Sequence, residues 1–139
     1  LCYSGQNHPV DKIHRHQNQQ MKRTDVIQYA HRVKEIAYEM KSALLRAEFV
    51  KFGALLHESW HLKKLFSNDI SNSYFDSIYD FALENGAVGG KLIGAGGGGF
   101  FLFQSEFNKK KNLVNALKEK KLVSRDFIFD DKGANAWII

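Results

Sequence analysis

A run of glycines constrains the fold of this chain more than any other sequence feature. Eight of the 11 glycines fall between Gly86 and Gly99, and five of them lie in the six-residue segment Gly94–Gly99. Glycine adopts positive φ without strain and lets another backbone or a ligand approach closely. Consecutive amides in such a loop can also point inward and hold an anion. The backbone at Gly94–Gly99 must therefore adopt conformations or contacts that side chains would prevent.

Two familiar phosphate-binding motifs do not fit this run. Gly94, Gly96 and Gly99 satisfy the spacing GxGxxG, but a dinucleotide-binding motif needs a helix directly afterwards, and FFLF at 100–103 is typical of a strand. A P-loop needs a lysine and then a serine or threonine after the last glycine, whereas Lys91 precedes the run. A ligand-free connection between strands is the simpler alternative, although a two-residue turn needs only one or two glycines.

Hydrophobic periodicity predicts helices before the glycines. Apolar residues three and four apart predict helix over 25–66, with Thr24 or Asp25 as the N-cap. A single helix of that length would be roughly 63 Å long, too long for a chain with a radius of gyration of about 14 Å. We therefore expect a break near Arg46–Glu48. Two further helices are predicted, at 11–22 and from Ser71 or Asn72 to Gly86.

After the helices the pattern changes to that of strands. The order of elements is a hairpin around the glycines, a basic helix and a second hairpin. This order predicts an α+β fold, with helices followed by a mostly antiparallel four-stranded sheet. The expected elements are strands at 88–93 and 100–104, a helix at 106–121, and strands at 123–129 and 134–138 joined by a turn at 130–133.

Composition narrows the class of protein. A chain of 139 residues with 44% hydrophobic and 13% aromatic residues is typical of one globular domain. Cys2 is the only cysteine, which excludes a disulfide framework within the chain and fits a reducing cytoplasm. The net charge of +5 comes largely from lysines at 109–121, which we assign to a solvated helix face and not to nucleic acid. No apolar run is long enough to cross a membrane.

Several segments resemble the GHMP kinases. KLIGAGGGGF at 91–100 resembles their third signature motif, and FGALLHESW at 52–60 is most similar to the branch that phosphorylates D-glycero-D-manno-heptose 7-phosphate. The segments Lys63-Lys64, 70–72 and 86–91 support the same branch, and LCYSG at 1–5 is similar to the end of its first domain.

The resemblance implies that residues 1–139 are the C-terminal domain of a two-domain, ATP-dependent kinase. Residues 1–22 would be the tail of the N-terminal domain or a linking helix, and the start at Leu1 suggests a truncated chain. The nucleotide loop, the Mg²⁺ ligand and the catalytic acidic residue would lie in the N-terminal domain, so we expect no catalytic residue here and an inactive fragment. In relatives the glycine loop supports the phosphate-binding loop, a role that falls here on Gly94, Ala95, Gly96, Gly97, Gly98 and Gly99.

Four other residues are candidates for substrate binding. Trp60 either stacks on a sugar ring or fills the helix core. Lys63 or Lys64 either contacts the 7-phosphate of the sugar or is solvated. Lys91 either reaches a phosphate or flanks the sheet edge.

His57 to His61 also match HExxH, the helix motif of zinc proteases, with Glu58 as a base and Glu84 as a conceivable third ligand. The longer form of the motif fails, because Lys64 and Ser67 stand where glycine and histidine are needed. A pair of histidines on a partly exposed helix is the simpler interpretation, and we assign no metal.

The resulting hypotheses belong to three classes. The leading one is a heptose 7-phosphate kinase that acts on the anomeric hydroxyl. A GHMP kinase for fucose, galactose or a similar substrate is the alternative. A stand-alone, non-enzymatic binding or dimerisation module of α+β type is the next. In the kinase hypotheses the strand at 100–103 should be buried on both faces, by the helices of this chain and by the missing domain, so the isolated fragment should dimerise or aggregate through the uncovered face. The last is the zinc hydrolase.

Overall fold

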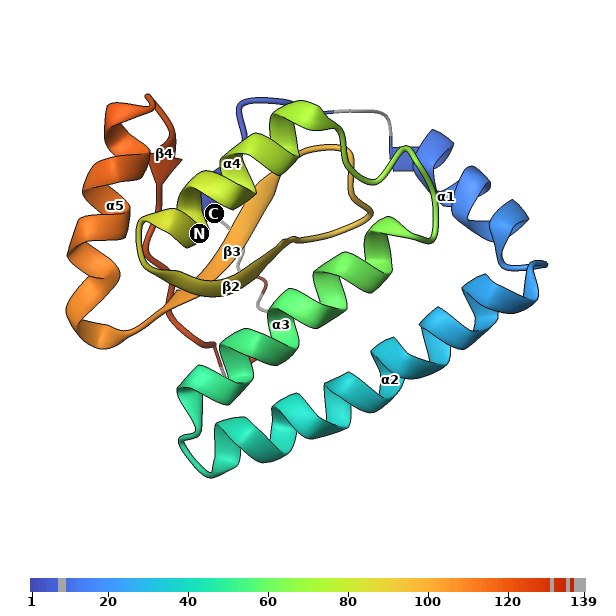
Figure 1. Ribbon diagram of the computed structural model, residues 1–139, viewed down its shortest axis with the longest axis horizontal. Coiled ribbons are helices and arrows are strands. Elements are labelled where there is room, and N and C mark those ends of the chain that lie inside the picture. The colour runs from blue at the N-terminus through green and yellow to red at the C-terminus, as the bar shows by residue number, and fades with distance from the viewer. Residues whose placement is uncertain (8–9, 131, 135, 137–139) are drawn as a thin grey trace.

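The computed structural model describes residues 1–7, 10–130, 132–134 and 136. Figure 1 shows helices packed against one sheet, with α2 and α3 side by side, α4 over the sheet and α5 beyond its edge. The fold is α+β, as predicted. Its elements are β1 (Cys2–Tyr3), α1 (Val10–Gln20), α2 (Thr24–Leu45), α3 (Phe49–Lys64), α4 (Ser73–Glu84), β2 (Ala87–Leu92), β3 (Phe100–Ser105), the 3-10 turn η1 (Phe107–Lys109), α5 (Lys110–Glu119) and β4 (Val123–Ser124).

The sheet has four strands in the order β2-β3-β1-β4, and every neighbouring pair is antiparallel. The strands that make up this sheet are not all the predicted ones. Cys2 and Tyr3 form an inner strand between β3 and β4, where Cys2 pairs with Phe101 on one side and with Ser124 on the other. Two residues are too few to show the alternating pattern of a strand, so this strand could not be predicted from the sequence.

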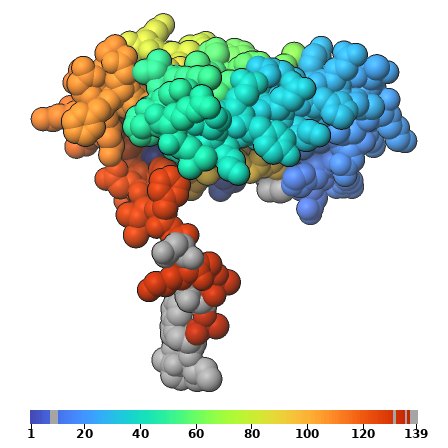
Figure 2. All heavy atoms as spheres, turned by 90° about the horizontal axis from the view of Figure 1, so that it is seen from below, coloured from blue at the N-terminus to red at the C-terminus, as the bar shows by residue number. Residues whose placement is uncertain are grey.

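The predicted C-terminal hairpin is not formed by the described residues. β4 ends at Ser124, and the rest of the strand predicted at 123–129 lies outside the sheet, with Phe129 90% exposed. Figure 2 shows this segment (red) leaving the body of the domain on the side opposite α4. The strand predicted at 134–138 falls largely outside the described residues.

The helices follow the sequence closely. The break predicted near residue 46 separates α2 from α3, and Ala47 there has a φ of 57°. Asn72 caps α4, because its side chain accepts a hydrogen bond from the amide of Phe75. The N-cap prediction for α2 is wrong: Arg23 occupies that position, and no side chain caps the helix.

The core lies between the sheet and the helices α3 and α4. Phe101 is fully buried and its ring centroid lies 6.2 Å from that of Trp60 and 6.3 Å from that of Phe75. Of residues 100–103 only Phe101 is fully buried and the other three are half-buried, so the cover expected from the N-terminal domain on the second face stays a prediction.

A close approach of α3 to β2 sets the position of the site described below. A Cβ added to Gly89 would lie 2.0 Å from the carbonyl oxygen of Gly53, so glycine is required where the helix crosses the strand. In the described part of the chain, no helix is long and apolar enough to cross a membrane.

Candidate glycine-loop site

The glycine run forms the connection between β2 and β3, and its backbone shows why glycine is needed. Five of its residues have positive φ, from 68° at Gly97 to 148° at Gly98. A Cβ on Gly98 would lie 2.5 Å from the carbonyl oxygen of Gln6 and 2.9 Å from the Cα of Asn7. The loop is therefore packed against another backbone, which confirms that side chains would prevent its conformation and contacts.

Hydrogen bonds attach the loop to three distant segments. The amide of Gly97 donates to the carbonyl of Ile70 before α4, at 2.9 Å, and the amide of Gly99 donates to that of Gln6, also at 2.9 Å. The side chain of Gln17 on α1 donates to the carbonyl of Ala95 at 2.9 Å. These bonds fix the loop from several sides and hold its shape before any ligand arrives.

Four other amides of the loop have no partner among the described residues. Within the part of the chain that the structure describes, no hydrogen-bond partner is present for the amides of Gly94, Ala95, Gly96 and Gly98. Unpartnered amides beside positive-φ glycines are typical of loops that hold anions. The arrangement can thus offer backbone donors to a phosphate while Gly97 and Gly99 keep the loop in place.

Two of the predicted lysines lie on the elements beside this loop, Lys63 on α3 and Lys91 on β2. The ammonium group of Lys63 donates to the carbonyl oxygen of Gly94, and that of Lys91 donates to the hydroxyl of Ser59 at 3.5 Å. Burial, followed by the positive charge of Lys91, lowers the pKa of Lys63 to about 8. Burial also lowers the pKa of Lys91.

The other two candidates are engaged elsewhere. Lys64 forms an ion pair with Asp76 at 2.9 Å, and that carboxylate also accepts a hydrogen bond from Ser71 at 2.9 Å. Trp60 is 0% exposed and packs against Tyr79 and Phe101. It has no surface on which a sugar ring can stack, so of its two predicted roles core packing holds.

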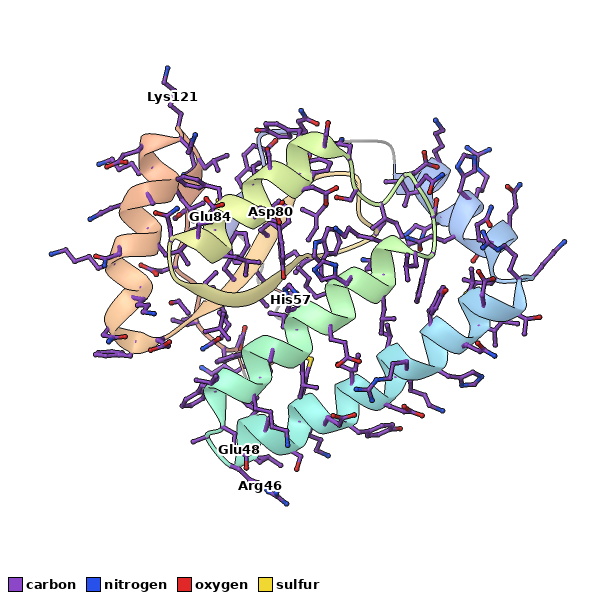
Figure 3. The ribbon with its side chains drawn as sticks, viewed as in Figure 1. Arg46, Glu48, His57, Asp80, Glu84 and Lys121 are labelled. Atoms are coloured by element: carbon purple, nitrogen blue, oxygen red, sulfur yellow. The ribbon has the colours of Figure 1, made fainter. Side chains whose placement is uncertain are left out.

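The HExxH segment is occupied by structural contacts. Both guanidinium nitrogens of Arg32 that face Glu58 bind its carboxylate, at 2.7 and 3.1 Å, which attaches α2 to α3. Nδ1 of His57 lies 2.8 Å from the hydroxyl of Tyr79. Figure 3 shows Glu84 near the end of α4, away from His57. Among the described residues no group of three metal-ligating side chains comes together, and this geometry does not support the zinc-hydrolase hypothesis.

Sequence reasoning missed two members of this region. Ser59 lies one helical turn before Lys63, and this spacing is the signal that points to it. Gln17 carries no signal, because its contact with Ala95 joins residues 78 positions apart.

Comparisons with known proteins identify a family that this chain matches. The family model for the C-terminal domain of GHMP kinases matches residues 40–121, more than half of the chain. A D-glycero-alpha-D-manno-heptose 7-phosphate kinase from Campylobacter jejuni is 41% identical over 109 residues, which are 78% of this chain and 32% of that protein. A bifunctional fucokinase/GDP-fucose pyrophosphorylase from Arabidopsis thaliana is 34% identical over 63% of this chain and 8% of its own length.

Solved structures show the same fold. The L. major mevalonate kinase in complex with R-mevalonate aligns with a TM-score of 0.76 and 22% identity, over 86% of this chain and 37% of the kinase. The chain thus spans about a third of the length of the bacterial heptose kinase and of this structure. It belongs to the GHMP kinases, and the matched segment is their C-terminal domain.

Proposed function

We propose that this chain is the C-terminal domain of an ATP-dependent sugar kinase that phosphorylates the anomeric hydroxyl of D-glycero-D-manno-heptose 7-phosphate. The observation that carries the proposal is the glycine loop, whose free amides and neighbouring lysines suit phosphate groups. The 41% identity to the Campylobacter heptose kinase supports the choice of sugar. The complete protein would work in the cytoplasm, where ATP and sugar phosphates are available.

In this proposal the work is divided between two domains. The N-terminal domain would hold most of ATP and Mg²⁺ and supply the catalytic acidic residue, as the membership of this chain in the GHMP kinases implies. The glycine loop would support the phosphate-binding loop of that domain. During transfer, the anomeric oxygen loses its proton to a base and bonds to the γ-phosphorus, while the bond to the bridging oxygen breaks and ADP leaves.

A second candidate is a kinase for a free sugar such as fucose or galactose. The 34% identity to a fucokinase over 63% of the chain favours this alternative. The two candidates differ in one chemical respect: the heptose substrate already carries a phosphate, and the free sugars do not.

The test uses the complete protein with ATP, Mg²⁺ and a panel containing heptose 7-phosphate, fucose, galactose and mannose. We expect turnover of heptose 7-phosphate at least tenfold more efficient than that of any free sugar, measured as ADP release and as the product phosphate by phosphorus NMR. Residues 1–139 alone are the matched control and should show no turnover. Preferred turnover of a free sugar would select the second candidate, and no turnover of any sugar would leave the non-enzymatic module.

A further inference from the structure

Three polar side chains gather where α3 meets β2, directly before the glycine loop. Ser59 and Lys63 lie one turn apart on α3, and Lys91 lies on β2 three residues before Gly94. Ser59 is 4% exposed, and both lysines are half-buried. The close contact between Gly53 and Gly89 fixes the distance between the two elements.

The charges in this group have no acidic partner among the described residues. Within the described residues, no carboxylate lies within 4.0 Å of the ammonium group of Lys63 or Lys91. The other lysines of α3 are paired, Lys51 with Glu48 at 3.6 Å and Lys64 with Asp76 at 2.9 Å. Two half-buried cations near each other destabilise the fold unless an anion neutralises them. The lowered pKa of Lys63 has this same origin, in burial and in the charge of Lys91.

We propose that Lys63, Lys91 and Ser59 bind a terminal phosphate group of a substrate. The two ammonium groups supply compensating charge, and the serine hydroxyl supplies a neutral donor. The ammonium group of Lys63 contacts Gly94, where the glycine loop begins, and that loop carries amides with no partner among the described residues. This inference deepens the proposed function and rests on it for the identity of the phosphate. That group is either the phosphate of the sugar or the γ-phosphate of ATP.

Direct binding tests the site without any turnover. The complete protein is titrated with inorganic phosphate by calorimetry, as wild type and as the Lys63→Gln, Lys91→Gln and doubly substituted variants. We expect the double substitution to weaken phosphate binding at least tenfold and each single one several-fold. Lys51→Gln, on the exposed side of α3, is the matched control and should bind as the wild type does. Binding by the double variant within twofold of the wild type overturns the proposal, and so does an absence of phosphate binding to the wild type.

Two further measurements show whether the bound phosphate belongs to the sugar or to ATP, and whether the variants are correctly folded. A raised KM for the sugar phosphate, with the KM for ATP unchanged, assigns the site to the sugar, and the reverse result assigns it to the nucleotide. Unchanged values for both overturn the proposal. Ser59→Ala, which keeps both lysines, should weaken phosphate binding about threefold in a protein whose circular dichroism matches the wild type. If the wild type phosphorylates no sugar, the proposed function fails, while the phosphate titration still decides the site.

Discussion

At the scale of single residues, the sequence could name candidates but not their partners. Lys63 and Lys64 are neighbours of the same type, yet one contacts the carbonyl of Gly94 and the other an acidic side chain on α4. The difference depends on which side of α3 faces the sheet, and that is decided by contacts between distant segments. The same holds for Trp60. The spacing of apolar residues on α3 shows that its side chain faces either the core or a ligand, and only the structure, in which Trp60 is fully buried, shows that it faces the core.

The lowered pKa of Lys63 makes a prediction about stability. Its pKa is about 8 in the folded chain against 10.5 normally, a shift that corresponds to roughly 3 kcal/mol before solvent screening. Below pH 8 the lysine is charged in the folded and in the unfolded chain, so folding carries the full free-energy cost of burying the charge. The cost disappears as the pH rises through 10.5, because the amine is then neutral folded and unfolded.

We therefore expect Lys63→Met to raise the free energy of unfolding by about 1 kcal/mol at pH 7, after the lost hydrogen bond to Gly94 is counted. This gain should shrink steadily above pH 8 and vanish near pH 10.5. Urea unfolding of the complete protein, followed by the fluorine signal of a fluorotryptophan at Trp60, measures it. Lys51→Met is the exposed control, and an equal gain there would contradict the explanation.

At the scale of elements, local signals predicted most of the fold. Apolar spacing located the helices, Asn72 and Gly86 marked the ends of α4, and helix length alone required the break after α2. The inner strand β1 was missed because its stability comes from partners near residues 100 and 124 and not from its own two residues. The strand predicted at 123–129 extends too far, because the β propensity of the apolar residues 127–129 does not provide a neighbouring strand.

Two helix ends make an element-scale prediction. Ala47 after α2 and Lys121 after α5 have φ values of 57° and 60°, and each end has the hydrogen bonds of a Schellman motif, where glycine is the favoured residue. Figure 3 shows Lys121 and, beside Ala47, Arg46 and Glu48 at the ends of these helices, pointing outward. Ala47→Gly and Lys121→Gly should each raise the free energy of unfolding by about 0.5–1 kcal/mol.

The matched control is Ala54→Gly, at an exposed position inside α3, where the same change should lower the free energy of unfolding by about 1 kcal/mol. Chemical unfolding of the complete protein compares the three variants. A loss of stability in Ala47→Gly would show that the positive φ at this helix end carries no cost.

At the scale of the whole molecule, the glycine loop joins parts of the chain that are far apart in sequence. It contacts the segment after β1, the side chain of Gln17 on α1 and the turn before α4, while its own ends continue into β2 and β3. The position of the free amides therefore depends on the packing of the entire domain. This is why the sequence could predict that the loop is special without predicting which amides remain available.

Substitutions at two glycines of the loop distinguish the effect of backbone strain from that of close packing. Gly94 and Gly98 both have positive φ, at 82° and 148°, so alanine is strained at either position. A Cβ at Gly94 meets nothing within 4 Å, whereas one at Gly98 would lie 2.5 Å from the carbonyl oxygen of Gln6. We expect Gly94→Ala to lower the free energy of unfolding by about 1 kcal/mol, and Gly98→Ala by about 3 kcal/mol or more.

Hydrogen exchange in the complete protein locates the damage. In Gly98→Ala the amides of Ser4 and Gly99 should exchange at least tenfold faster than in Gly94→Ala, because the bonds from Ser4 to Gly99 and from Gly99 to Gln6 attach β1 to the loop. Phosphate binding should weaken with them if the loop and the N-terminal segment act as one unit. Equal effects of the two substitutions would mean that backbone strain alone, and not the close contact between the segments, determines the stability of the loop.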